Sequence, residues 1–259
     1  MTNLTLKVPK EDVEKLRTEL LNRGFYEISS PNTLWSLSNG QAYIHLYPSG
    51  TLLLQGKGTQ ELKEFILSLL TPSEKILVGC DESGKGDIFG PLVLCCAIIK
   101  PEYYKKALDL NLRDCKKMKD EEVIKKAKAF ESFGEFRCKV IEPPELNQMY
   151  EGIKNLNRIL DRLYLEILRD IKKSYPFAEV FVDAYSKRSP FGKEVVFEHK
   201  GEENIAVATA SVLARAKFLE WLKDKKLPKG SSLESLSLAR SIYREDREWA
   251  KKLLKTFFL

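Results

Sequence analysis

The chain has 259 residues, a length that suits one large domain or two of medium size. Hydrophobic residues make up 43% of it, and no apolar run approaches the roughly 20 residues that cross a bilayer. The net charge of +6 is compatible with a nucleic-acid partner, whereas the charged N-terminus lacks the apolar core of a signal peptide. We therefore expect a cytoplasmic protein with no membrane contact.

The number and spacing of the cysteines argue against two kinds of covalent or metal cross-link. There are five cysteines, an odd number, with no Cys-x-x-Cys pair, which argues against a disulfide framework and against a zinc site. We expect them to be buried as small hydrophobic side chains. They are Cys80, Cys95, Cys96, Cys115 and Cys138.

Residues 1–70 are predicted to form a small α+β domain. Its strands are expected at 5–8, 42–47 and 51–55, and its helices at 10–23 and 60–70. Pro48-Ser49-Gly50 is typical of a hairpin turn between the last two strands. Residues 71–73 are expected to be a short linker.

Residues 75–259 are predicted to form a second domain, an α/β mixed sheet flanked by helices. Strands are expected at 76–80, 92–99, 136–141 and 179–183. Helices are expected at 120–130, 152–175, 205–226 and over much of 231–259, where Trp249 is predicted to anchor the core.

The end of the 76–80 strand carries the strongest chemical signal. Two carboxylates, Asp81 and Glu82, follow the apolar run directly, and Gly84-Lys85-Gly86 comes next. Buried acids are costly unless a cation compensates them. A hard divalent metal, which prefers oxygen ligands and supports phosphoryl-transfer chemistry, is the obvious candidate.

The same residues allow two other interpretations. Gly79, Gly84 and Lys85 fit the frame of a phosphate-binding P-loop, but Gly86 stands where Ser or Thr would bind magnesium. The acids inside that loop would also repel a phosphate. The second alternative is an ordinary strand-to-turn junction with solvated acids.

Asp183 repeats the pattern, because it ends a second apolar strand. Asp81 and Glu82 can serve one site only if the chain turns at Glu82, since neighbouring strand side chains point to opposite faces. A fourth acid is expected in 199–203, before the helix near Ile205. Four carboxylates could hold two magnesium or manganese ions about 4 Å apart.

Taken together, these motifs resemble the type 2 and type 3 ribonucleases H. The segments that carry the resemblance are 81–87, 89–92, 113–117 (with Cys115 where serine is usual), 155–157, 181–183 and 199–215. The Gly-Lys-Gly triplet and the N-terminal extension are similar to type 3. In that family the extension has a fold resembling half of a TATA-binding protein and grips the substrate.

The resemblance implies a ribonuclease H-like fold and hydrolysis of the RNA strand of RNA–DNA hybrids, leaving 3′-hydroxyl and 5′-phosphate ends. We expect a monomer with no obligate protein partner. Matching the family's motifs to this sequence position by position, the resemblance implies that the catalytic and metal-binding acids are Asp81, Glu82, Asp183 and Glu202, with Glu203 the alternative to Glu202. The residues implied in substrate binding are Gly84, Lys85 and Gly86 at ribose 2′-hydroxyls, Lys116 at a phosphate and Ser211 at the DNA strand.

Two rival functions stay open on the sequence. One is a nucleic-acid-binding protein without catalysis, although intact acids at all four matched positions disfavour it. The other is type 2 behaviour, incision at single ribonucleotides embedded in DNA. That behaviour uses a tyrosine beneath the sugar, for which Tyr185 and Tyr243 are the candidates.

Overall fold

A computed structural model of the chain describes residues 2–71, 74–112, 118–199 and 204–259. No helix in these ranges is long and apolar enough to cross a bilayer. The chain groups into two compact units: Met1–Glu74 with Lys100–Arg113, and Lys75–Ile99 with Asp114–Leu259. The sequence did not predict that residues 100–113 return to the first unit.

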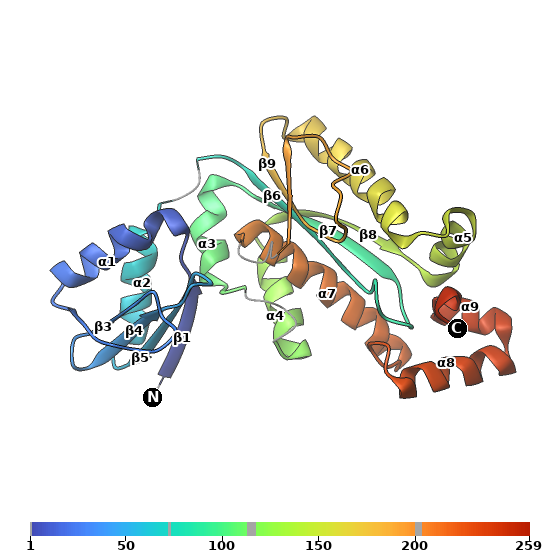
Figure 1. Cartoon of the computed structure of the whole chain (residues 1–259), viewed down its shortest axis with the longest axis horizontal. Coiled ribbons are helices and arrows are strands. Elements are labelled where there is room, and N and C mark those ends of the chain that lie inside the picture. The colour runs from blue at the N-terminus through green and yellow to red at the C-terminus, as the bar shows by residue number, and fades with distance from the viewer. Residues whose placement is uncertain (1, 72–73, 113–117, 200–203) are drawn as a thin grey trace. The chain divides into compact units, whose positions relative to one another are not determined.

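The first unit is built on a five-stranded antiparallel sheet in the order β1-β5-β4-β3-β2 (Figure 1). Strand alternation turns Leu6, Ile44 and Leu54 to one face, where they are fully buried with Leu16 and Ile66 of the helices. The elements are β1 (Thr2–Lys7), η1 (Lys10–Asp12), α1 (Val13–Asn22), β2 (Tyr26–Glu27), β3 (Trp35–Ser38), β4 (Ala42–Leu46), β5 (Thr51–Gly56), α2 (Thr59–Leu69), η2 (Pro101–Tyr103) and α3 (Tyr104–Asp109). The short strands β2 and β3 were not predicted.

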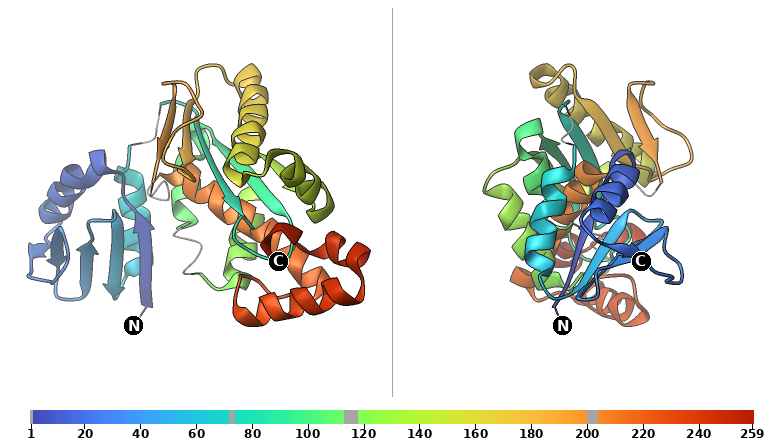
Figure 2. Two further views of the ribbon diagram at one scale, coloured as in Figure 1. Left: turned by 45° about the vertical axis from the view of Figure 1, so that its right-hand side comes forward. Right: turned by 90° about the vertical axis from the view of Figure 1, so that its left-hand side faces the viewer.

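The second unit contains a mixed sheet in the order β10-β9-β6-β7-β8. Its central strand, β6, is antiparallel to β7 and parallel to β9. Helix α7 covers one face and α6 the other, as Figure 2 shows, so the predicted mixed sheet flanked by helices is confirmed. The elements are β6 (Leu77–Ser83), β7 (Leu92–Ile99), α4 (Asp120–Glu131), β8 (Glu135–Ile141), α5 (Pro143–Ile153), α6 (Leu156–Ser174), β9 (Glu179–Asp183), β10 (Val195–Glu198), α7 (Ile205–Lys225), α8 (Leu233–Glu245), α9 (Arg247–Leu253) and η5 (Thr256–Phe258).

The helix predicted at 152–175 begins later, at Leu156, and the separate helix α5 before it was not predicted. Helix α5 ends at Ile153, and Lys154 adopts a left-handed conformation with φ of +52°. Asn155 then caps α6 by accepting a hydrogen bond from the Arg158 N–H at 3.2 Å. The amphipathic pattern continues across this break, and periodicity alone therefore missed it.

Gly79 fixes how closely α7 approaches the sheet. A Cβ at this position would lie 2.0 Å from the carbonyl carbon of Ala206 and 2.1 Å from the nitrogen of Val207. Only glycine allows the backbones of β6 and α7 to meet at this distance. The first turn of α7 is thereby held against the strand that carries Asp81 and Glu82.

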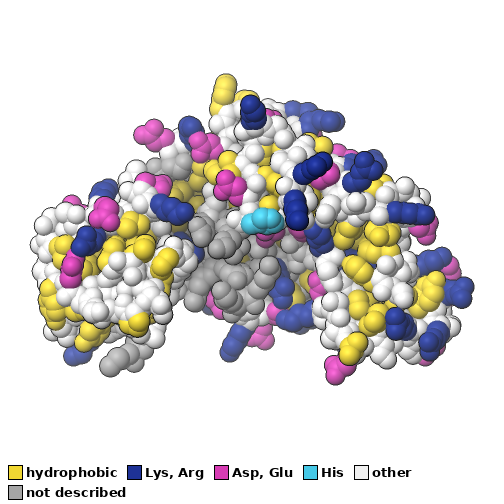
Figure 3. Space-filling view, viewed as in Figure 1, with side chains coloured by type: hydrophobic (Ala, Val, Ile, Leu, Met, Phe, Trp, Pro, Cys, Tyr) yellow, Lys and Arg dark blue, Asp and Glu magenta, His cyan; other side chains and the backbone are white. Residues whose placement is uncertain are grey.

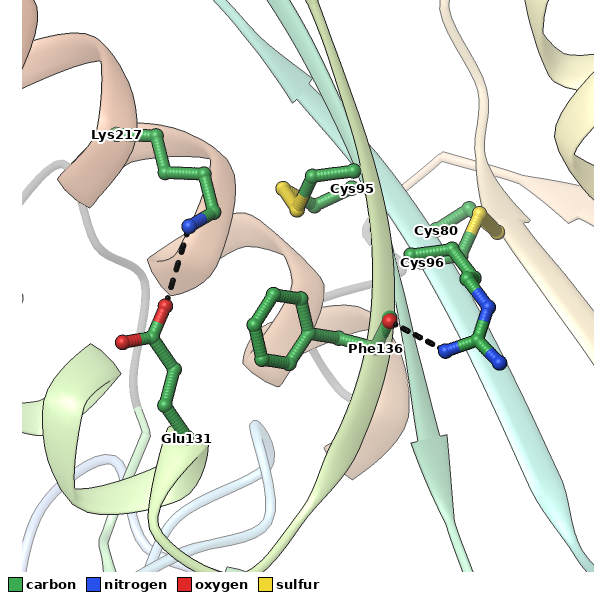
Figure 4. The surroundings of a disulfide bond; sticks show 8 residues. Cys80, Cys95, Cys96, Glu131, Phe136 and Lys217 are labelled. Carbon is green, nitrogen blue, oxygen red and sulfur yellow. Dashed lines mark hydrogen bonds and ion pairs between the residues drawn. A yellow bond between two sulfur atoms is a disulfide. The ribbon is translucent and has the colours of Figure 1, made fainter.

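The expectation that the cysteines form no disulfide is wrong for four of the five, although Cys80, Cys95 and Cys96 are fully buried as expected. Cys80 is bonded to Cys96, and Cys95 to Cys138, so two disulfides join β6, β7 and β8 (Figure 4). The strand register sets Cys80 opposite Cys96 and Cys95 opposite Cys138. That register is a property of the folded sheet, and spacing along the chain did not reveal it. Cys115 lies outside the described residues.

The prediction that Trp249 anchors the core is also wrong. Trp249 lies in the first turn of α9 with 53% of its surface exposed, whereas Ala250, Leu253 and Leu254 are buried. The register of α9 turns these aliphatic side chains inward instead. The C-terminal segment is therefore packed into the second unit through Leu253 and Leu254.

Candidate active site

Asp81 and Asp183 lie at one edge of the second sheet because their strands are parallel neighbours. Cys80 pairs with Val182, so the residues that follow them, Asp81 and Asp183, are level with each other. Both acids fall on the α7 side of the sheet, opposite the face that buries Val182. The Ser211 hydroxyl, on α7, hydrogen-bonds to the Asp81 carboxyl group. Ser211, predicted to contact DNA, is thus placed beside an acid.

Glu82 departs from the expected geometry. The chain does not turn at Glu82, because β6 stays paired with β7 through Ser83 and turns only at Gly84, where φ is +87°. The Glu82 side chain is therefore directed to the opposite face from Asp81, and Tyr164 of α6 donates a hydrogen bond to its Oε2 at 2.7 Å. Asp81 and Asp183 therefore share the α7 side, whereas Glu82 lies on the other side of β6, close enough for its charge to raise the pKa of Asp81.

The electrostatics of this edge favour a cation. Burial, then the charges of Glu82 and Asp183, raise the pKa of Asp81 to about 8. Hydrogen bonds from Ser211 and from the Glu82 N–H, at 2.7 Å, oppose this shift. Carboxylates this close repel each other, and a bound divalent ion would reverse the sign of that interaction.

Two tyrosines support the site from the α6 side, and sequence reasoning did not assign this role. Tyr164 is fully buried and stacks on Tyr185, with ring centroids 5.4 Å apart. The Tyr185 hydroxyl donates to Asp161 at 2.7 Å, and burial raises the pKa of both phenols. The available signal was that Tyr164 falls on the apolar face of a helix, which is also typical of a core residue.

The Gly84-Lys85-Gly86 loop follows the acids directly. A Cβ on Gly84 would lie 2.2 Å from the Pro91 carbonyl oxygen, whereas a Cβ on Gly86 would meet nothing within 4 Å. Lys85 Nζ donates to the Tyr185 carbonyl at 3.0 Å and lies 5.4 Å from the centre of its ring. The loop is tied to the segment after Asp183, with Gly86 open to an approaching ligand.

Two predicted site positions lie outside the described residues. They are Lys116 and the fourth acid, Glu202 or its alternative Glu203. In the described ranges, no three acidic, histidine or cysteine side chains by themselves form a metal-sized cluster. The described residues just after the fourth acid are Asn204, which accepts a hydrogen bond from the Ala206 N–H at 2.9 Å, and the start of α7.

Comparison with known proteins gives consistent matches. The family model described as Ribonuclease HII matches residues 78–252. A Ribonuclease HIII of Aquifex aeolicus (strain VF5) is 40% identical over 249 residues, covering 94% of this chain and 96% of that protein. A Ribonuclease HIII of Protochlamydia amoebophila is 29% identical and covers 99% and 92%.

Solved structures agree with the sequence matches. The crystal structure of Aquifex aeolicus RNase H3 aligns with a TM-score of 0.65 at 38% identity, covering 99% of this chain and all of that one. The crystal structure of Bst-RNase HIII in complex with Mn²⁺ aligns with a TM-score of 0.66 at 22% identity, covering 98% and 95%. At that lower identity the second likeness concerns the fold.

Proposed function

This chain belongs to the ribonuclease HII family and is a ribonuclease H, and we propose that it cuts the RNA strand of RNA–DNA hybrids by a two-metal-ion mechanism. We further propose that the products carry 3′-hydroxyl and 5′-phosphate ends. The observation that carries the proposal is the level placement of Asp81 and Asp183 on parallel strands, with the raised pKa of Asp81.

We propose Asp81, Glu82, Asp183 and Glu202 as the acids that hold Mg²⁺ or Mn²⁺. The donor set fits, because carboxylate oxygens are what these ions prefer and Asp81 is destabilised as an anion without them. Bst-RNase HIII was crystallised with Mn²⁺, which supports a divalent ion in this fold. When bound, such ions supply an activated water and stabilise the leaving oxygen.

The protein residues around the acids are assigned positioning and recognition roles. Ser211 orients the Asp81 carboxylate, and Tyr164 orients Glu82. The open backbone at Gly86 suits close approach to the ribose 2′-hydroxyls, which is the contact that distinguishes RNA from DNA. Lys85 holds that backbone to Tyr185, and Lys116 is proposed to contact a phosphate.

We propose that the N-terminal domain, residues 1–70, adds affinity for the hybrid and no chemistry. The sheet face opposite its helices carries Asn3, Tyr43 and Gln55 in one cross-strand row. Tyr43 has 44% of its surface exposed. Figure 3 shows Lys and Arg side chains over the second unit, with Asp and Glu side chains among them. Cytoplasmic location and a monomeric state complete the proposal.

The test is cleavage of an end-labelled hybrid with Mg²⁺, with Mn²⁺ and with a chelator. We expect metal-dependent cuts in the RNA strand and loss of activity by orders of magnitude in Asp183→Asn. Glu202→Gln and Glu203→Gln, made in parallel, identify the fourth acid. Binding without cleavage by the metal-loaded wild type would instead favour a non-catalytic hybrid-binding protein.

A second substrate tests the type 2 alternative. Tyr185, one candidate for the tyrosine beneath a lone ribonucleotide, is stacked on Tyr164 and hydrogen-bonded to Asp161. It is thus already engaged within the protein. We expect efficient cutting within runs of ribonucleotides and poor cutting at a single one. Equal cleavage rates on a full RNA–DNA hybrid and on a DNA duplex with a single ribonucleotide would contradict this expectation.

A further inference from the structure

Lys255 is a fully buried lysine outside the acid cluster. Its Nζ donates to three main-chain carbonyls, those of Asp87 at 2.9 Å, Phe89 at 3.2 Å and Gly90 at 2.6 Å. An ammonium has three N–H donors, so the three carbonyls satisfy it completely. Burial lowers the pKa of this group and the Asp87 carboxylate opposes the shift, so these bonds are what make a buried cation tolerable here.

The main chain around Lys255 is bonded to the same loop. The Lys255 N–H donates to the Ile88 carbonyl at 2.8 Å, and the Gly90 N–H donates to the Leu253 carbonyl at 2.9 Å. Asn147 of α5 holds this tail from the other side. Its Nδ2 donates to the Leu254 carbonyl at 2.9 Å, and its Oδ1 accepts from the Thr256 N–H at 2.9 Å.

Residues 87–90 in turn support the Gly84-Lys85-Gly86 backbone. Asp87 N–H donates to the Gly84 carbonyl at 3.4 Å, and the Asp87 carboxylate accepts from the Gly230 N–H at 2.5 Å. Gly84 itself is packed so closely on Pro91 that no side chain fits there. A displacement of the 87–90 carbonyls would therefore be transmitted to the turn that follows the acids.

We propose that Lys255 is a positioning residue for hybrid recognition: its ammonium fixes the carbonyls of Asp87, Phe89 and Gly90 and so holds the Gly84–Gly86 backbone in its binding conformation. The proposal rests on the recognition role given to that loop above. Because Lys255 is fully buried under the loop, its ammonium is not available to contact the phosphates of a bound hybrid. Substitution of Lys255 should therefore weaken binding to the hybrid more than binding to a DNA duplex, and it should leave the salt dependence of binding unchanged.

The test is hybrid binding by Lys255→Met, measured with a chelator so that metal ions and chemistry do not contribute. Met keeps an unbranched apolar stem of similar length and removes the three donors. We expect the Kd for an RNA–DNA hybrid to rise at least tenfold and the Kd for a DNA duplex of the same sequence to change less than twofold. The slope of log Kd against log salt should stay the same. Lys255→Arg, which keeps a charged donor, should recover part of the affinity.

Phe130→Leu, a buried change on α4 away from the loop, controls for a general loss of stability. It should leave both Kd values unchanged. Hydrogen exchange in Lys255→Met should accelerate at residues 88–90 and not in β9. Unchanged hybrid affinity in a folded Lys255→Met protein would overturn the inference.

Should Lys255→Met fail to fold, Asn147→Ala decides instead, because it loosens the tail and leaves the ammonium in place. A rise in hybrid Kd of threefold or more, with faster exchange at 88–90, supports the inference. Unchanged binding with faster exchange overturns it. Metal-dependent cleavage by the wild type is scored separately, so failure of the proposed function is not mistaken for failure of this inference.

Discussion

Replacing Asp81 by Asn should stabilise the metal-free protein at pH 8 and abolish hydrolysis. The pKa of Asp81 is raised from 3.8 to about 8, first by burial and then by Glu82 and Asp183. Between those pH values the folded protein holds a proton that the unfolded chain has lost. Asp81 therefore contributes a stability that falls as pH rises through this window.

The magnitude follows from the same numbers. A pKa displaced from 3.8 to about 8 corresponds to about 6 kcal/mol of lost stability at high pH. Asp81 is only half-buried, so water screens part of this, and we expect roughly 3 kcal/mol. Asn retains one acceptor oxygen, which can serve the Glu82 N–H, and so the substitution removes the charge while keeping that hydrogen bond.

The assay is urea unfolding in a chelator from pH 5 to pH 9. We expect the stability of Asp81→Asn minus that of the wild type to grow with pH and level off near pH 8. Asp170→Asn is the matched control, because Asp170 is exposed and its pKa is lowered by Lys173, the opposite sign. Added Mg²⁺ should stabilise the wild type more than Asp81→Asn. Parallel pH curves for wild type and Asp81→Asn would refute the reasoning.

Three further predictions follow from particular contacts. Gly79→Ala should destabilise by about 3 kcal/mol or more in urea unfolding, since its Cβ would meet the α7 backbone at 2.0 Å, whereas Gly86→Ala, with open space, should change stability little. Tyr164→Phe should lower kcat roughly tenfold with KM nearly unchanged, because Glu82 loses the hydrogen bond that orients it; an unchanged kcat would show that the bond is only structural. Deleting residues 1–70 should raise KM strongly, leave kcat less affected and make the salt dependence of hybrid binding shallower; an unchanged salt slope would assign that domain another role.

The sequence predicts those site residues that can be recognised from the single strand to which each belongs. Asp81 and Asp183 each end an apolar run, and parallel pairing then makes them neighbours. The direction of Glu82 was not predictable in this way, because it depends on how far β6 stays paired with β7. The two disulfides were missed for the same reason, since Cys95 and Cys138 are 43 positions apart and meet only through register.

Long-range contacts also explain the errors around the loop and the C-terminus. Asp87 directly follows the Gly-Lys-Gly turn in the sequence, yet its carboxylate accepts from the Gly230 N–H, 143 positions away. Lys255 has no feature in the sequence that separates it from an exposed lysine near a chain end. Its burial depends on the packing of α9 and on the hydrogen bonds of Asn147, which are tertiary contacts.

The strand that carries Asp81 and Glu82 is held more firmly to β7 than to β9, the strand that carries Asp183. On one side, β6 is fastened to β7 by a complete antiparallel ladder and by the Cys80–Cys96 disulfide, and the loop beyond it is held by Lys255. On the other side, β9 contributes Asp183 through four parallel pairings to β6 and no covalent link. Once Asp81 ionises, above about pH 8, its repulsion with Asp183 acts across the boundary between β6 and β9, which has fewer constraints. Backbone pairing already sets Asp81 level with Asp183, so a bound divalent ion would offset this repulsion without having to realign the strands.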